Sequence, residues 1–215
     1  LALLPFFMAL RAAVRMAISV EAGDLAEAAH YRALGAELLK APSPRLLAIG
    51  GLLGAGKSTL AQAVAPTLAG PCGARLLRTD SLPPEPSTES PAASVQDFSD
   101  RATVYRVLAQ RARSALAAGS SVIADATFRE DPARAAIEGA AGPHPFLGVW
   151  LRAEACQRVA RAVHGRCDAP DSAAKVALEQ VEPRGVGHGW RIVDAGRPAA
   201  ELAKEVRNLL APRPA

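Results

Sequence analysis

Short apolar runs alternate along most of the chain with longer segments in which apolar residues recur every three or four positions. The runs predict strands at 45–50, 74–80, 121–127, 145–151 and 189–194, the first of them without helical spacing and so buried on both faces. The periodic segments predict helices at 57–68, 100–118, 132–140, 154–163, 172–181 and 199–210. Strands and helices that alternate in this way predict an α/β fold with a doubly wound, five-stranded parallel sheet.

The first 39 residues carry only the helical pattern. Charged residues from Arg11 to Glu37 fall among apolar ones at helical spacing, and Gly23 interrupts the pattern, so two amphipathic helices are expected. Pro42 and Pro44 follow, and prolines prevent a helix from continuing. We therefore divide the chain into a helical segment, 1–41, and an α/β domain, 44–215.

Apolar side chains are concentrated at the beginning of the helical segment. They are too many to stay in water on an isolated pair of helices, and they comprise Leu3, Leu4, Phe6, Phe7 and Leu10. We expect them to pack on the α/β domain or on a second copy, and we favour a homodimer through these helices. The stretch is too short to cross a bilayer, so no membrane association is expected.

Composition narrows the class of protein. The 215 residues suffice for one well-cored domain with an appendage, and a chain that is 50% hydrophobic and 21% charged is neither wholly disordered nor a polytopic membrane protein. Three cysteines without C-x-x-C spacing indicate a reducing compartment, and we expect a cytoplasmic protein. The net charge of +4 suits a ligand that carries phosphate, whereas nucleic acid is not expected, because the chain has 4% aromatic residues and no basic stripe interleaved with them.

A glycine-rich segment between the first predicted strand and the next helix matches G-x-x-x-x-G-K-[ST] in full. It comprises Gly51, Leu52, Leu53, Gly54, Ala55, Gly56, Lys57, Ser58 and Thr59. The glycines let the backbone N–H groups wind around an anion, Lys57 can reach the β- and γ-phosphates, and Ser58 can offer its hydroxyl to Mg²⁺. The alternative is a glycine-rich turn that carries Lys-Ser by chance, and the flanking strand and helix disfavour it. The sequence therefore predicts a site for ATP and Mg²⁺.

Two acids stand at the carboxyl ends of predicted strands, Asp80 at the end of the second and Asp125 near the end of the third. In an open parallel sheet, ligands bind outside these ends, so both acids should lie on the same rim as the glycine-rich loop. Each could instead be a turn or helix-capping acid.

The chain from Pro44 onward resembles the P-loop kinases of the adenylate-kinase, gluconate-kinase, zeta-toxin and polynucleotide-kinase group. Beside the glycine-rich loop, the resemblance is carried by the phrases L-R-T-D, V-Y-R-V-L-A-Q-R-A, S-V-I-A-D-A-T-F and G-V-W-L-R-A. They look most like a bacterial branch in which such a domain is fused behind an aminoglycoside-phosphotransferase-like domain. Residues 1–40 resemble the tail of that upstream domain.

This resemblance implies the strand order 2-3-1-4-5, which puts the third strand beside the first. Asp125 would then lie next to Lys57 and Ser58 as a Walker-B-like carboxylate that acts on Mg²⁺ through water. Asp80 matches the acid that orients and deprotonates the acceptor hydroxyl in these kinases. Phosphoryl transfer asks for such a base and for cations around the transferring group.

The cations are expected after the fourth strand. Arg158 and Arg161 are three residues apart on a predicted helix, and Arg166 precedes an exposed loop at 167–171. The segment resembles the arginine-bearing lid of these kinases, which closes over the phosphates and excludes water. A solvated basic face is the alternative. Among these cations, Arg161 is our first candidate.

The chain departs from its relatives after the strand-two acid. Relatives carry a helix there with an arginine that holds the acceptor, whereas residues 81–97 are rich in proline and serine and should form no helix at their start. This segment is either a flexible substrate flap or a sign of lost acceptor binding. Arg101 is the nearest replacement for the missing cation.

These observations favour an ATP-dependent phosphotransferase that moves the γ-phosphate to a hydroxyl of a small molecule. The alternative is an ATP-binding or ATP-hydrolysing accessory module of a larger protein, without an acceptor of its own. A polynucleotide 5′-hydroxyl kinase shares the motifs but would need a basic channel with stacking aromatic residues. The sequence does not identify the acceptor.

Overall fold

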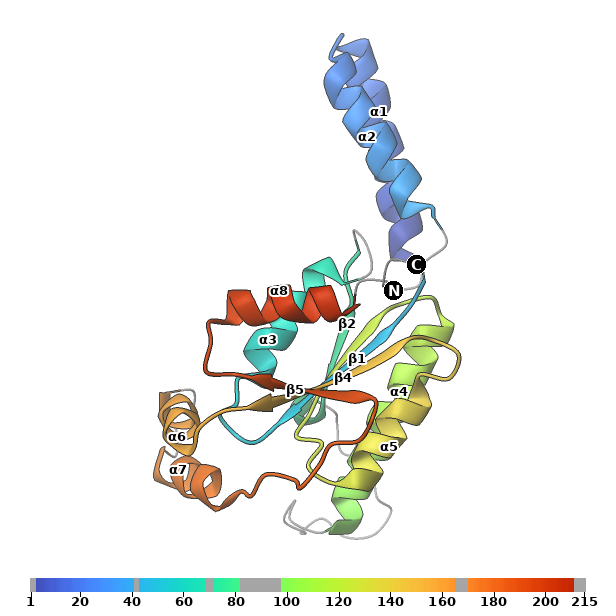
Figure 1. The fold of residues 1–215 in the computed structure, drawn as a ribbon. Coiled ribbons are helices and arrows are strands. Elements are labelled where there is room, and N and C mark those ends of the chain that lie inside the picture. The colour runs from blue at the N-terminus through green and yellow to red at the C-terminus, as the bar shows by residue number, and fades with distance from the viewer. Residues whose placement is uncertain (1–2, 41–42, 69–71, 82–97, 165–169, 211–215) are drawn as a thin grey trace, which may run out of the picture.

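The computed structural model describes residues 3–40, 43–68, 72–81, 98–164 and 170–210. In these ranges five strands form one sheet in the order β2-β3-β1-β4-β5, and all neighbouring strands pair in parallel (Figure 1). The strands are β1 (Leu46–Gly51), β2 (Arg75–Arg78), β3 (Val122–Asp125), β4 (Phe146–Arg152) and β5 (Trp190–Asp194). The predicted doubly wound α/β fold and its strand order are confirmed.

Helices cover both faces of the sheet (Figure 1). On one face lie α3 (Lys57–Val64) and α8 (Ala199–Leu210), and on the other lie α4 (Phe98–Ala117) and α5 (Asp131–Ala140). A further pair, α6 (Ala155–His164) and α7 (Pro170–Glu179), lies beyond the carboxyl end of β4. Any ligand at the carboxyl edge of the sheet is therefore close to this pair.

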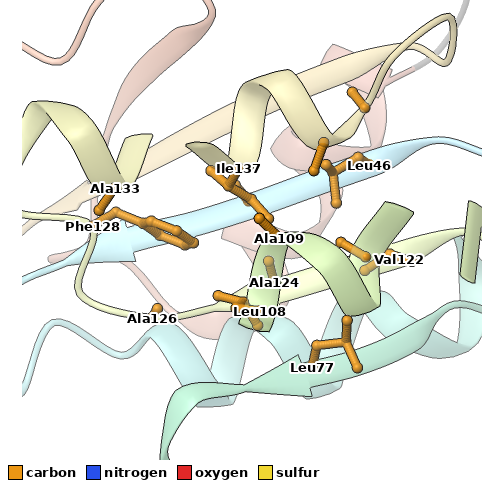
Figure 2. Packing of buried hydrophobic residues seen from close by; sticks show 14 of the residues in the cluster. Leu46, Leu77, Leu108, Ala109, Val122, Ala124, Ala126, Phe128, Ala133 and Ile137 are labelled. Carbon is orange, nitrogen blue, oxygen red and sulfur yellow. The ribbon is translucent and has the colours of Figure 1, made fainter. Parts of the chain in front are cut away.

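The alternation of side chains along the strands builds two apolar clusters, one on each face. Leu46 and Val122 point toward α4 and α5, in the cluster that Figure 2 shows from close by. Leu47 and Ile123 point to the opposite face, where α3 and α8 pack. Because side chains alternate along a strand, Asp125 emerges on the same face as Ile123. The strand period thus directs this acid toward the beginning of α3.

Several elements are shorter than predicted, and helix α3 and strand β2 are the two that bear on the site. Helix α3 ends at Val64 and continues as a 3₁₀ turn, η1 (Ala65–Thr67), because the ring of Pro66 is incompatible with an α-helical interior. Strand β2 ends at Arg78, and Asp80 lies in a second 3₁₀ turn, η2 (Thr79–Ser81). Asp80 therefore stands beyond the strand on a tight turn.

The described part of the helical segment forms the expected pair of helices, α1 (Leu4–Glu21) and α2 (Leu25–Leu38). Gly23 has a φ of +78° in the turn between them, and the Asp24 side chain caps α2 by accepting a hydrogen bond from the Glu27 backbone N–H at 2.9 Å. The hairpin projects from the amino-terminal edge of the sheet, away from α6 and α7 (Figure 1). Among the described residues, no helix is long and apolar enough to cross a membrane.

Candidate active site

The glycine-rich loop joins β1 to α3 at the carboxyl edge of the sheet. Gly51, Gly54 and Gly56 have φ values of +144°, +77° and +90°, a region that side chains with a Cβ rarely adopt. Gly56 forms the N-cap of α3, so the helix begins directly at Lys57. The loop therefore presents backbone N–H groups and the positive end of a helix dipole at one place, an arrangement that suits an anion.

Helix α6 packs directly on this loop. A Cβ added to Gly54 would come within 2.7 Å of the carbonyl carbon of Arg158 and 2.9 Å of its Cα. Two features therefore require glycine at position 54: its own backbone conformation and the close approach of α6. The first turns of α6 and the loop form one unit.

The segment after α7 also returns to the loop. The side-chain oxygen of Gln180 accepts a hydrogen bond from the backbone N–H of Leu53 at 2.7 Å. Two residues further, Glu182 accepts a hydrogen bond from the indole N–H of Trp150 on β4, also at 2.7 Å. The Leu53 N–H is therefore satisfied by the protein, and so is the Ala55 N–H, which donates a hydrogen bond of 3.1 Å to the Leu52 carbonyl oxygen. The N–H groups that can face an anion belong to other residues of the loop.

Ser58 and Asp125 meet in front of α3, as the resemblance implied. The Ser58 hydroxyl donates a hydrogen bond of 2.7 Å to Oδ2 of Asp125, which is 4% exposed. Asp125 faces Ile49 of β1 on one side and Arg78 of β2 on the other in the strand register. The carboxylate is thus fixed by the central strands of the sheet.

Lys57 lies beside this pair. Its Nζ donates a hydrogen bond of 3.0 Å to the carbonyl oxygen of Leu52, so the side chain folds back over the loop. Burial lowers the pKa of Lys57, the attraction of Asp125 and Asp80 opposes that shift only in part, and the nearby charge of Arg78 adds to it. The ammonium group therefore lacks full compensation by protein charges, which suits the binding of a polyphosphate.

Arg78 is a site residue that our sequence analysis did not single out. Its Nη2 donates a hydrogen bond of 2.9 Å to Ser58 Oγ, and its Nε lies 3.2 Å from Asp125 Oδ2. The same Nη2 is 4.0 Å from a carboxylate oxygen of Asp80. Arg78 thus joins the two acids that we assigned to different tasks. Alternation in the segment R-L-L-R-T-D puts Arg78 on the face of Leu76, but only the register of β2 against β3 reveals its partner.

Asp80 is placed at the rim of the site rather than in it. Its side chain is 78% exposed, and Arg78 is the described cation nearest to it by ion-pair distance. The segment that follows, 82–97, with its expected flap, lies outside the described residues. Arg101, the expected replacement cation, is exposed on the first turns of α4.

The two arginines expected to form a pair on α6 have different surroundings. Arg158 is 5% exposed, and its Nη1 donates a hydrogen bond of 2.7 Å to the carbonyl oxygen of Ala177 in α7. Because α7 packs over this part of α6, Arg158 connects the two helices and does not belong to an open basic face, which was the alternative to the lid. Arg161 is exposed, and its Nη1 would lie 3.9 Å from a Cβ on Gly56, so it stands beside the glycine-rich loop. Arg166 lies outside the described residues.

The loop after β3 is held by two side chains that our sequence analysis did not assign. The hydroxyl of Tyr105 on α4 is 2.7 Å from Thr127 Oγ1 and accepts a hydrogen bond of 3.2 Å from the Phe128 backbone N–H. Arg134 of α5 is 4% exposed, and its Nη1 donates a hydrogen bond of 2.7 Å to the carbonyl oxygen of Phe128. Thr127 in turn accepts a hydrogen bond of 3.2 Å from the backbone N–H of Gly51. The loop after Asp125 and the glycine-rich loop therefore support each other.

The fold and the loop define the class: the chain is a nucleotide-binding P-loop protein with the parallel sheet of small kinases. A family model described as an AAA domain matches residues 46–183, and the chain belongs to that family. Comparison with curated proteins gives no match.

Solved structures share this fold. APS kinase of Mycobacterium tuberculosis, with AMPPNP and APS bound, has a TM-score of 0.56 at 20% identity over 79% of this chain and 98% of that chain. A gluconokinase from Sinorhizobium meliloti has a TM-score of 0.54 at 24% identity over 78% of this chain and 97% of that one. A sugar kinase from Janibacter has a TM-score of 0.54 at 20% identity over 79% and 95% of the two chains. The kinase-type fold that we predicted is confirmed.

Proposed function

We propose that the protein is an ATP-dependent phosphotransferase that moves the γ-phosphate of ATP to a hydroxyl group of a small molecule. The observation that carries the proposal is the cluster at the carboxyl edge of the sheet, where the glycine-rich loop, Lys57, and the hydrogen-bonded pair of Ser58 and Asp125 meet. The solved structures with the same fold support it, since their names are those of kinases for APS, gluconate and sugars.

The donor set in front of α3 fits Mg²⁺. Mg²⁺ prefers hard oxygen ligands and binds through one or two protein groups while it keeps several waters. A hydroxyl, Ser58 Oγ, and a carboxylate oxygen, Asp125 Oδ2, lie 2.7 Å apart there. No group of three or more His, Cys, Asp or Glu side chains that could hold a metal occurs among the described residues, so a metal bound by protein ligands alone is not favoured there. When bound, Mg²⁺ would neutralise charge on the β- and γ-phosphates.

The side chains of the site divide the remaining work. The N–H groups from Gly56 to Ser58 would hold the phosphates, and the Lys57 ammonium would neutralise part of their charge. Arg161, beside the loop, would contact the transferring group. Asp80 would accept the proton of the acceptor hydroxyl while the oxygen of that hydroxyl forms a bond to the γ-phosphorus. The bond between the γ-phosphorus and the β–γ bridging oxygen breaks at the same time, and ADP leaves.

A panel assay tests the proposal. Release of ADP is measured with sugars, aminoglycosides, nucleosides and oligonucleotides as acceptors, and the phosphorylated product is identified by mass spectrometry. We expect one class of small hydroxylated compounds to stimulate ADP release, and Asp80→Asn to abolish that stimulation while ATP binding is kept. Asp194→Asn, an exposed acid at the end of β5, serves as the matched control and should keep the parent rate.

Two results would contradict the proposal. ADP release that no small acceptor stimulates would favour an accessory module that binds or hydrolyses ATP. Stimulation by oligonucleotides alone would favour the polynucleotide kinase.

A further inference from the structure

Arg78 brings a guanidinium group to the oxygens that would bind the metal. Ser58 Oγ accepts its hydrogen bond at 2.9 Å, and Asp125 Oδ2 lies 3.2 Å from its Nε. These are the same two oxygens that suit Mg²⁺. In the strand register Arg78 stands directly opposite Asp125, so the contact follows from the pairing of β2 with β3. The positively charged guanidinium of Arg78 therefore already contacts both Ser58 Oγ and Asp125 Oδ2.

We propose that Arg78 takes the place of the metal in the metal-free site and that Mg²⁺ binds by displacing it. This inference rests on the proposed function. Asp125 is 4% exposed, and a carboxylate buried to that degree needs a compensating positive charge. Lys57 is a second cation close by, but its Nζ is hydrogen-bonded to the Leu52 carbonyl. Arg78 thus keeps Ser58 and Asp125 together until the metal arrives.

The ion pair between Arg78 and Asp125 is of a kind that Mg²⁺ can displace. Its Nε is buried yet makes no hydrogen bond to any described residue, so the contact of 3.2 Å to Asp125 is an ion pair without hydrogen-bond alignment. The side chain is 32% exposed, which leaves it room to turn outward. An unaligned, partly exposed ion pair is weaker than a buried, two-point one.

Asp80 offers the displaced guanidinium a second partner. Its carboxylate lies 4.0 Å from Arg78 Nη2 and is 78% exposed. Arg78 can therefore release Ser58 and Asp125 and remain paired with an acid, so that no charge is left alone. Arg78 is accordingly a positioning residue that links occupation of the metal site to the surroundings of Asp80.

Thermal unfolding with ADP as the probe tests this inference. The parent, Arg78→Met and Arg75→Met are melted with ADP in EDTA and then over a series of Mg²⁺ concentrations. Arg75 is the matched control because it is exposed on the same strand and, three residues away, points to the opposite face. We expect Arg78→Met to have a lower Tm without metal and a half-saturating Mg²⁺ concentration about fivefold lower than the parent, the size of one partly exposed charge pair. Arg75→Met should keep the parent value.

Each other outcome decides against the inference. If Arg78→Met lowers the Tm equally at every Mg²⁺ concentration, with an unchanged half-saturating value, Arg78 is a structural ion-pair partner only. A raised half-saturating value would make it a residue that assists the metal. If ADP binds in EDTA but these shifts are missing, the inference alone fails, whereas a parent that binds no ADP overturns the proposed function as well. Should Arg78→Met not fold, Arg78→Gln keeps a donor without the charge and is interpreted in the same way.

Discussion

Replacing Gly54 by alanine should separate α6 from the glycine-rich loop. The new Cβ would meet the main chain of Arg158, within 2.7 Å of its carbonyl carbon, and backbone atoms of a helix cannot turn aside as a flexible side chain can. Gly54 also has a φ of +77°, which disfavours any residue with a Cβ. Two separate terms therefore destabilise the variant.

The cost of the backbone conformation and the cost of the clash with Arg158 can be measured separately. The left-handed backbone conformation costs about 1–2 kcal/mol for a residue other than glycine. Forcing a group into a packed site costs about 1–3 kcal/mol more. Gly187 has a φ of +89°, and no atom lies within 4 Å of an added Cβ there, so Gly187→Ala carries the backbone term alone. The difference between the two variants is the free energy of the clash with Arg158.

Urea unfolding of the nucleotide-free protein gives both values by linear extrapolation. We expect Gly187→Ala to lose about 1–2 kcal/mol of unfolding free energy, and Gly54→Ala to lose about 1–3 kcal/mol beyond that. Gly54→Ala should also lose ATP binding, because the loop and α6 cannot both keep their positions. Equal losses in the two variants would refute the close packing of α6 on the loop.

Three further predictions concern Lys57 and the amino-terminal hairpin. Because burial lowers the pKa of Lys57, the charged ammonium is disfavoured in the folded state, so Lys57→Met should melt at the same or a higher temperature than the parent at pH 7 without ligand. It should lose the stabilisation by ATP, about 2.7 kcal/mol at a hundredfold excess over Kd in the parent; a lower ligand-free Tm with full ATP stabilisation would contradict this assignment. As the pH rises through the lowered pKa, Lys57 loses its charge, so ATP affinity should fall at a lower pH than for an ordinary lysine, and calorimetry between pH 7 and 10 measures this. Phe6 and Phe7 are 54% and 57% exposed on α1, so the parent should sediment as a dimer and Phe7→Glu as a monomer, and a monomeric parent would contradict pairing through these helices.

The structural features that depend on local sequence pattern could be predicted from the sequence. The run Leu46–Gly51 lacks helical spacing and is buried at every position, and the glycines of the following loop have the positive φ values that the motif requires. Asp125 could be placed near Ser58 because the resemblance supplied the strand order. Each of these features is set by neighbours in the chain or by a known topology.

The features that sequence analysis missed depend on contacts between distant elements. The i,i+3 spacing of Arg158 and Arg161 is correct, but the docking of α7, unknown from the sequence, buries Arg158 and leaves Arg161 exposed. The contact of Arg78 with Asp125 depends on the register of β2 against β3, which the sequence of β2 alone does not show. Spacing within one segment cannot reveal which of its residues another segment will cover.

Calorimetric titration of ATP, in EDTA and in Mg²⁺, tests the central claim most directly when the parent is compared with Asp125→Asn. The variant removes the charge from the carboxylate that accepts the Ser58 hydrogen bond and leaves the glycine-rich loop unchanged. We predict that ATP binds both proteins in EDTA and that Mg²⁺ strengthens binding to the parent but has little effect on the variant. Absence of ATP binding to the parent, or an equal gain from Mg²⁺ in both proteins, would contradict the assignment of this site.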